Sequence, residues 1–157
     1  MAVKPIPEGY HTVSPYLAVD DASAAIDFYQ RAFGATERGR MPAPGGKIGH
    51  AELQIGDSIV MLSDQFPQST TKPPKELGGT TTSMFLYVED VDAVVQQAVD
   101  AGATLTMPVD NMFWGDRFGG VTDPFGHQWQ IATHVEDVPP DEMVERAKKA
   151  MAEMAGG

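Results

Sequence analysis

The stretch YLAVDDASAAIDFYQRAFGAT, residues 16–36, returns in diverged form as FLYVEDVDAVVQQAVDAGAT, residues 85–104. The matching positions are Tyr16 with Phe85, Val19 with Val88, and Asp21 with Asp90. Each copy has the order of a short apolar strand, an acidic residue, a helical segment and Gly-Ala-Thr. The chain therefore carries a two-copy duplication, and a long array of repeats is excluded.

Local chemistry supports this interpretation of each copy. Asp20 or Asp21 in the first copy, and Asp90 in the second, can accept hydrogen bonds from the free amides of a helix start. Gly34 and Gly102 suit the left-handed position that ends a helix. One helical face of the first copy is apolar and consists of Ala22, Ala25, Ile26, Tyr29 and Phe33.

Strand-like segments come after each helix. A hairpin turn is indicated at Gly56-Asp57 in the first copy, and a turn at residues 123–126 in the second. Each copy thus predicts a βαβββ module, and the fold class is α+β, with two tandem modules forming curved mixed sheets around a cup. The expected organisation is a first module with an N-terminal arm at 1–63, a linker at 64–80, a second module at 81–137 and a C-terminal helix at 138–157.

Composition narrows the possible functions. The chain has 157 residues and a net charge of −11, which disfavours nucleic acid and anionic membranes as partners and would attract a cationic ligand. The absence of cysteine excludes disulfides, thiolate metal sites and cysteine nucleophiles. No apolar run is long enough to span a bilayer, and the N-terminal residues lack the apolar core of a signal peptide, so a cytoplasmic protein is expected.

Strand alternation separates two faces of each predicted sheet. An apolar face, which includes Leu53 and Trp129, is expected to meet the helices. The opposite face would enclose a pocket. Its predicted substrate-binding residues are Ser14, Tyr16, Ser83, Tyr87 and Gln130, with His50 and Glu52 alternating on one strand.

The segments VDDASAAIDFYQRAFGA and DPFGHQWQI, within a duplicated βαβββ unit, resemble the vicinal oxygen chelate superfamily. That superfamily includes glyoxalase I, bleomycin-resistance proteins and extradiol dioxygenases. With IGHAEL, FWGDRFG and ATHVED included, the chain is most similar to the PhnB-like, glyoxalase-like branch, over roughly residues 10–137. The resemblance implies a pocket in each sheet and a homodimer.

In metal-dependent members of that superfamily, side chains on the first and last strands of each module hold a divalent ion. The matching positions here are Ser14, Ser83, one of residues 60–62, and Gln130. Because such ions favour imidazole and carboxylate ligands, no metal is expected at the usual position. A divalent metal at a non-standard site, held by His50 and Glu52 together with substrate oxygens or Asp116, stays open.

Two groups of residues are the best candidates for catalysis and substrate binding. His50 and Glu52 are predicted to act as acid and base, or as a displaced metal pair. Trp114, Asp116 and Arg117 are predicted to face them across the cup, with Arg117 receiving an anionic group and Trp114 forming an aromatic wall. The alternative for Asp116 and Arg117 is a structural ion pair, and His127 is predicted to be a solvated turn residue.

These residues suggest three functions. The first is a glyoxalase-like lyase or isomerase that acts on an oxygenated small molecule, with His50, Glu52 and Arg117 as catalytic groups. The main alternative is a protein of the bleomycin-resistance kind, which sequesters a ligand without catalysis. The third is a structural protein whose partner is another protein. The C-terminal helix has an apolar side at Met143, Ala147, Ala150 and Met151 that would cover a pocket, pack on the sheet or join a dimer.

Overall fold

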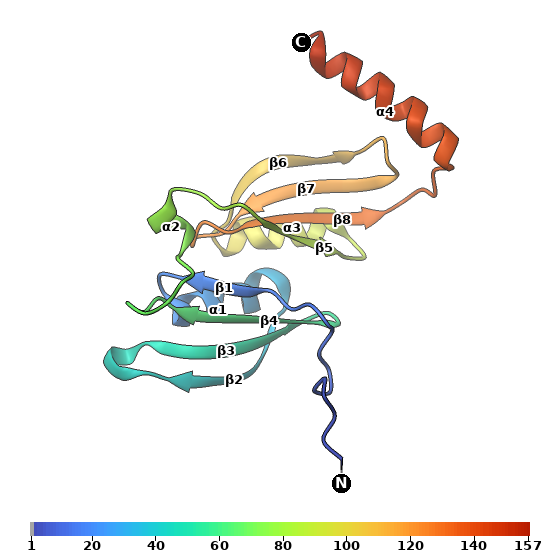
Figure 1. Cartoon of the computed structure of the whole chain (residues 1–157). Coiled ribbons are helices and arrows are strands. Elements are labelled where there is room, and N and C mark those ends of the chain that lie inside the picture. Colours follow the sequence, from blue (N-terminus) through green and yellow to red (C-terminus); the bar gives the residue numbers. More distant parts are fainter. Residues whose placement is uncertain (1) are drawn as a thin grey trace.

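The computed structural model describes residues 2–157 and consists of two modules followed by a helix (Figure 1). The first module contains β1 (Tyr16–Val19), α1 (Ala22–Phe33), β2 (Thr36–Pro42), β3 (Ile48–Ile55) and β4 (Ser58–Asp64), with a 3-10 turn, η1 (Pro44–Gly46). The second contains β5 (Ser83–Tyr87), α3 (Val91–Ala101), β6 (Thr104–Asn111), β7 (Asp116–Thr122) and β8 (Gln128–His134). A short helix, α2 (Pro74–Leu77), lies between them, and α4 (Pro140–Ala155) ends the chain.

Each module forms its own four-stranded mixed sheet. The strand orders are β1-β4-β3-β2 and β5-β8-β7-β6, so the two sheets have the same topology. In both sheets the first strand runs parallel to the last, and the remaining neighbours are antiparallel. The predicted α+β fold with two tandem βαβββ modules is confirmed.

The two module helices begin and end as the repeat predicts. The carboxylates of Asp21 and Asp90 accept from amides in the first turn of α1 and α3 at 3.0 and 3.1 Å. The last strand of each module adds a second cap, because Asp64 accepts from the amide of Ala22 and Thr133 accepts from that of Val91, both at 2.9 Å. Each helix start is thereby tied to the last strand of its own sheet.

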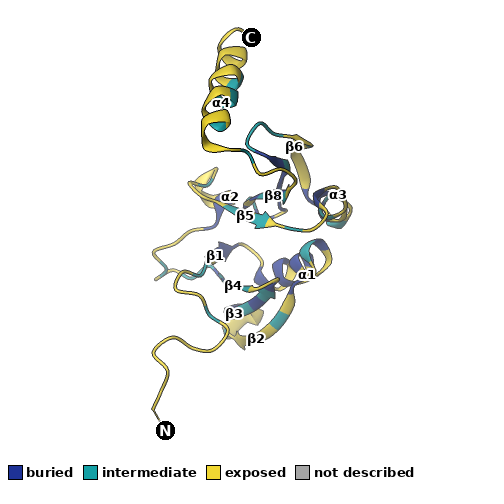
Figure 2. Cartoon of the chain, turned by 90° about the vertical axis from the view of Figure 1, so that its right-hand side faces the viewer, coloured by how far each residue is buried: buried dark blue, intermediate teal, exposed yellow. Residues whose placement is uncertain are grey.

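Both helices cover the same side of the molecule, and the other side of each sheet is left open (Figures 1 and 2). Leu53, Ile131 and Trp129 lie on the covered side and are at most 1% exposed. Phe28 and Ala32 are buried although they lie outside the predicted apolar stripe of α1. Phe28 packs on Phe125 of the β7–β8 turn, and Ala32 lies where α1 packs against α3, with its carbonyl accepting from Gln97. One continuous core therefore joins the modules.

Asp123, in the turn between β7 and β8, organises the contact between the modules. Its carboxylate is 4% exposed and accepts four hydrogen bonds. The donors are the Tyr29 hydroxyl at 2.6 Å and the Trp129 indole, the Phe125 amide and the His127 amide, each at 2.9 Å. Burial and the neighbouring Asp123 charge raise the pKa of Tyr29, so this hydroxyl remains a donor.

The prediction that His127 is a solvated turn residue is wrong. His127 is 8% exposed, and its Nε2 donates to the carbonyl oxygen of Ala18 at 2.9 Å. That carbonyl lies on the outer edge of β1, where no strand of the described chain pairs with it. The β7–β8 turn thus reaches the other module and satisfies its edge strand, a contact between residues more than a hundred positions apart that the local sequence does not indicate.

Helix α4 projects from the body (Figures 1 and 2) and buries none of its residues. It is fixed at its base by Arg146, which makes a two-pronged ion pair with Glu136 and also donates to the carbonyl of Phe113. Within residues 2–157, α4 has no extensive contact with a strand and lines neither of the two larger cavities, so of the three predicted roles only joining a dimer stays a prediction. Between residues 2 and 157, no helix has the length and apolarity needed to cross a bilayer.

Candidate functional site

The open face of the first sheet carries the predicted pair of acid–base residues. His50 and Glu52 alternate on β3, and both are half-buried. The Tyr16 hydroxyl, on β1, lies 2.9 Å from His50 Nδ1. This contact fixes one ring nitrogen of His50 and leaves Nε2 without a protein partner in the described chain, so that it is available to a ligand.

The open face of the second sheet is aromatic. Phe85 lies between Tyr87 and Phe118, with ring centroids 5.1 and 5.8 Å away, and Trp114 meets Phe118 edge-on at 5.7 Å. We call these four side chains the aromatic panel. Phe85 and Tyr87 are 43% and 65% exposed. Such a panel offers flat apolar area to a ring-containing ligand or to another protein surface.

Asp116 anchors one end of the aromatic panel. It is 2% exposed, and its Oδ2 accepts from the Tyr87 hydroxyl and the Trp114 indole, both at 2.9 Å. Its Oδ1 lies 2.8 Å from Nδ1 of His134. Burial opposes ionisation, but the donors from His134, Tyr87 and Trp114 outweigh it and hold the pKa of Asp116 below its usual value. Sequence reasoning missed His134, although its position at the end of the last strand, within ATHVED, was visible.

Arg117 does not lie where it was predicted. Its guanidinium makes two hydrogen bonds to Asp92 in the first turn of α3, at 2.7 and 2.9 Å, on the helix side of the sheet. Adjacent strand residues point to opposite faces, so Asp116 and Arg117 cannot both face the open side. They also do not pair with each other, which rules out the structural pair that was the alternative.

The two groups of predicted site residues are not brought together within one chain. His50 and Glu52 lie near the start of β3, and Asp116 is the first residue of β7 in the other sheet. Strand β3 starts at the left of Figure 1, whereas β7 starts at its right. Both sheets turn their open faces to the same side of the molecule, so neither face looks into the other. The expectation that Trp114 and Asp116 face His50 across one cup is wrong for the single chain.

The positions that hold a divalent ion in metal-dependent relatives do not fit one here. On the last strand of the first module Met61 is the open-face residue, since it pairs with Tyr16 and Glu52 while its neighbours Val60 and Leu62 are buried. The donor set is therefore Ser14, Ser83, Met61 and Gln130, which lacks both imidazole and carboxylate.

The non-standard metal site predicted from the sequence loses Asp116 as a ligand, because Asp116 lies on the other sheet from His50 and Glu52. Substrate oxygens remain the other predicted source of ligands. Across residues 2–157, no three His, Asp or Glu side chains converge closely enough to hold a metal ion.

Comparisons with known proteins agree with this architecture. Residues 10–131 match the family model of the Glyoxalase/Bleomycin resistance protein/Dioxygenase superfamily. The chain belongs to this superfamily. It is 48% identical over 134 residues to the uncharacterized protein Rv0887c of Mycobacterium tuberculosis, a match that covers 83% of this chain and 79% of that protein.

Solved structures from the same superfamily or with the same fold support the assignment. The crystal structure of TioX from Micromonospora is 31% identical and superposes with a TM-score of 0.62, over 80% of this chain and 99% of that one. The PhnB protein from Bacillus cereus has a TM-score of 0.62 at 17% identity and covers 78% of this chain and 99% of its own, which shows a shared fold. Members of the glyoxalase superfamily bind small molecules, so the open faces are the natural place to look for a ligand.

His134 joins Asp116, at the aromatic panel, to Asp137 after the last strand, and we call this pair of contacts the His134 tether. The tether depends on pH. Its two ring nitrogens lie 2.7 Å from Asp137 and 2.8 Å from Asp116, and only the doubly protonated ring can donate to both carboxylates. The hydrogen bonds to Asp137 and Asp116 accordingly raise the pKa of His134 above its ordinary value of 6.5. A raised folded-state pKa means that the tether is complete below 6.5 and is lost as the pH rises through the folded pKa.

We therefore expect the NMR titration midpoint of His134 to lie above 6.5 and to fall in the Asp137→Asn variant. Hydrogen exchange of the Val135 and Glu136 amides, which both donate to the Gly115 carbonyl, should quicken as the pH rises through the folded pKa of His134, above 6.5, after correction for intrinsic rates. A His134 midpoint at or below 6.5, or one that is unchanged in Asp137→Asn, would contradict the tether.

Proposed function

We propose that this protein is a glyoxalase-type enzyme that transfers a proton on an oxygenated small molecule, with His50 as the base. The contact between Tyr16 and Nδ1 of His50 carries the proposal, because it orients the ring and leaves Nε2 without a partner in the described chain. When Nδ1 donates to the Tyr16 oxygen, the Nε2 lone pair accepts a proton from the substrate, and the protonated ring then returns it. The reaction class is an isomerisation or an elimination next to a carbonyl group.

Glu52 is the second group in this proposal. It lies two residues after His50 on β3, so both side chains share a face, and it has no hydrogen-bond or ion-pair partner in the described chain. A half-buried carboxylate in this place can accept a hydroxyl proton of the substrate or stabilise the imidazolium formed on His50. Arg117 has no part in this site, because its guanidinium is committed to Asp92 on the opposite side.

We further propose a homodimer in which the open face of one chain's first sheet meets the second sheet of its partner. The exposed Tyr16 and Met41 on the first sheet, and Phe85 and Tyr87 on the second, give both faces apolar area that a partner can cover. This arrangement would place the aromatic panel opposite His50. Sedimentation of a monomer at micromolar concentration would contradict it.

The test of the enzyme proposal is proton exchange at carbon. Protein in D₂O is mixed with α-hydroxyketones such as hydroxyacetone, or with 2-oxo acids, and loss of the α-proton is followed by NMR. We expect the His50→Ala variant to lose exchange by a factor of at least about 100 and the Tyr16→Phe variant to lose less, since Tyr16 only orients the ring. His11→Ala is the matched control, and equal exchange in the His50→Ala variant would refute the role of His50.

A second candidate function is sequestration of a ligand without turnover, and the aromatic panel supports it. A ring-containing compound that protects the protein against thermal unfolding but shows no proton exchange would favour this function. Such protection should weaken in the Phe85→Ala variant and persist in His50→Ala. Phe85→Ala and His50→Ala therefore distinguish sequestration from proton-transfer catalysis.

A further inference from the structure

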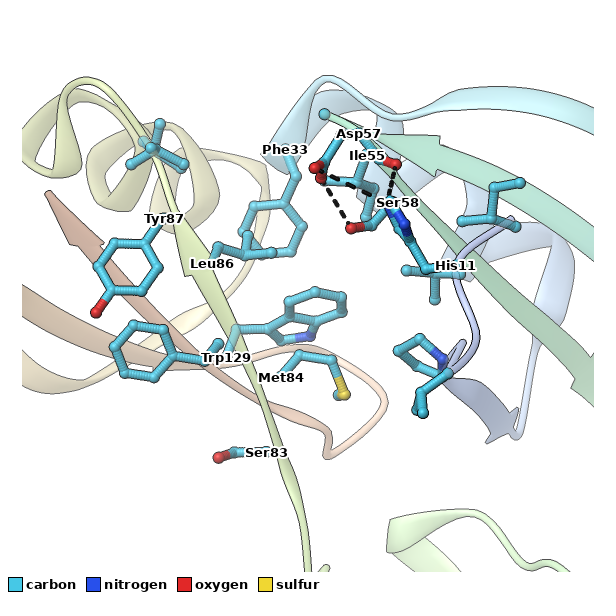
Figure 3. A pocket seen from close by; sticks show the side chains of 18 of the residues that line it. His11, Phe33, Ile55, Asp57, Ser58, Ser83, Met84, Leu86, Tyr87 and Trp129 are labelled. Atoms are coloured by element: carbon cyan, nitrogen blue, oxygen red, sulfur yellow. Dashed lines mark hydrogen bonds and ion pairs between the residues drawn. The ribbon is translucent and has the colours of Figure 1, made fainter. Parts of the chain in front are cut away.

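A cavity of about 940 Å³ lies between the modules (Figure 3). Phe85 and Tyr87 of the aromatic panel are among its lining residues, whereas His50 and Glu52 are not. Met84, Leu86 and Trp129 of the second module form one wall, and the β3–β4 turn with Ser58 forms the other. The floor is aromatic, because the rings of Trp129 and Phe33 lie 4.6 Å apart. This is an apolar space with a polar rim, the usual form of a small-molecule site.

The internal repeat explains why this space exists. The equivalent place in the other half is narrowed by the β7–β8 turn, in which Phe125 packs on α1 and His127 bonds to the edge of β1. The cavity that is left beside Ala18 and His127 is smaller, at about 510 Å³. That turn spans the five residues 123–127, whereas the β3–β4 turn consists only of Gly56-Asp57. The shorter β3–β4 turn has no counterpart of Phe125 or His127, so the larger cavity corresponds to a place that the chain partly fills in the other half.

The repeat also indicates which backbone carbonyl at the cavity lacks a hydrogen-bond donor. In β1 the outward carbonyl of Ala18 accepts from the ring nitrogen of His127. Tyr87 is the equivalent residue of β5, which is likewise an edge strand, and the amide of Val88 bonds inward to β8. Alternation of backbone direction turns the Tyr87 carbonyl outward along the cavity wall, with no donor from the described chain.

The residues at the rim of the cavity indicate which ligand charge the cavity favours. Asp57 and Glu89 are the permanently charged residues that line the cavity, and no lysine or arginine is among the lining residues. His11 bonds to the backbone carbonyl of Asp57, at the same rim. The rim and the net charge of −11 both favour a cation over an anion.

We propose that this cavity binds a small amine with an aromatic body. The ring would occupy the space that corresponds to Phe125, against Trp129 and Phe33. The ammonium group would correspond to the His127 nitrogen and donate to the Tyr87 carbonyl, beside Glu89. The ligand would thus provide an aromatic ring and a hydrogen-bond donor, as Phe125 and His127 do in the other half of the chain.

Intrinsic fluorescence gives a direct test, because the chain has only two tryptophans and Trp129 lies on the cavity wall. In the Trp114→Phe variant, Trp129 reports alone. We expect 3-phenylpropylamine to change this fluorescence with saturation, and to bind at least about tenfold more tightly than 3-phenylpropionate at low salt, with 3-phenylpropanol between them. Equal binding of the three compounds, or no saturation by the amine, would overturn the proposal.

A blocking variant ties the binding to this cavity. Ser58 is half-buried at the mouth, and Ser58→Arg adds both bulk and positive charge there. We expect amine binding to fall at least about tenfold in this variant and to persist in Gln96→Arg, which adds the same side chain on the exposed part of α3 beside Asp100. The double variant Asp57→Asn, Glu89→Gln should keep the phenylpropanol affinity and lose the preference for the amine.

Binding in the His50→Ala variant and the oligomeric state of Ser58→Arg test the location of the ligand. Amine binding that survives Ser58→Arg but disappears in His50→Ala would move the ligand to the open face and refute the cavity site. If the Ser58→Arg variant instead turns a dimer into a monomer, the cavity is an interface between copies of this chain, and the ligand proposal fails. Unchanged binding in His50→Ala together with an unchanged oligomeric state supports the cavity site.

Discussion

Replacing Asp123 with alanine is expected to destabilise the protein by about 4 kcal/mol, because four donors lose a buried acceptor at once. Two of these donors are backbone amides of the β7–β8 turn, and the other two are the Tyr29 hydroxyl and the Trp129 indole at the contact between the modules. None can turn to water without opening the turn, since Asp123 and Trp129 are 4% and 1% exposed. Urea unfolding followed by circular dichroism measures the change.

The control for Asp123→Ala is Asp57→Ala in the equivalent turn of the first module. The Asp57 side chain is 90% exposed and satisfies no buried donor, so we expect that variant to stay within about 0.5 kcal/mol of the parent. Asp123→Asn should fall between the two, because an amide oxygen still accepts at one position while its NH₂ group cannot accept from Trp129. Similar losses for Asp123→Ala and Asp57→Ala would contradict the role of this carboxylate.

The sequence predicts those parts of the fold that depend on local chemistry repeated twice. Asp21 and Asp90 are followed by helices that end at Gly34 and Gly102, and both modules have the predicted βαβββ order. Alternation along a single strand is equally predictable, and His50 and Glu52 do share a face. The same alternation predicts that Asp116 and Arg117, as neighbours on a strand, point to opposite faces of the sheet. The prediction that both face the cup was therefore wrong on local grounds.

The parts that could not be predicted depend on how the modules meet. The bond from His127 to Ala18 and that from Tyr29 to Asp123 join residues about a hundred positions apart. No local pattern encodes their pairing, and a histidine after a tight turn is more commonly solvated. The separation of His50 from Asp116 has the same origin, since it depends on both open faces turning to one side of the molecule. The cavity is an intermediate case, because the unequal lengths of the two turns were visible in the sequence while the space between them was not.

The second large effect is expected at Gly115, where the loop before β7 meets the segment that leads to α4. Gly115 has a φ of +101°, and a Cβ atom added there would collide with the backbone carbonyl oxygen of Glu136. Its own carbonyl accepts from the amides of Val135 and Glu136 at 2.9 and 3.0 Å. An alanine at this position must therefore both adopt an unfavourable φ and push the 134–138 segment away.

We expect Gly115→Ala to reduce the free energy of unfolding by about 3 kcal/mol, of which about 1 kcal/mol is the cost of the positive φ. Gly45→Ala isolates that smaller part, because Gly45 has a φ of +78° and nothing within 4 Å of an added Cβ. The displaced segment carries His134, so the aromatic panel should loosen in Gly115→Ala alone, seen as a change of Trp114 fluorescence in a Trp129→Phe background. Equal losses in the two glycine variants would mean that the contact with Glu136 does not hold this loop, and that the anchoring of α4 depends on Arg146 instead.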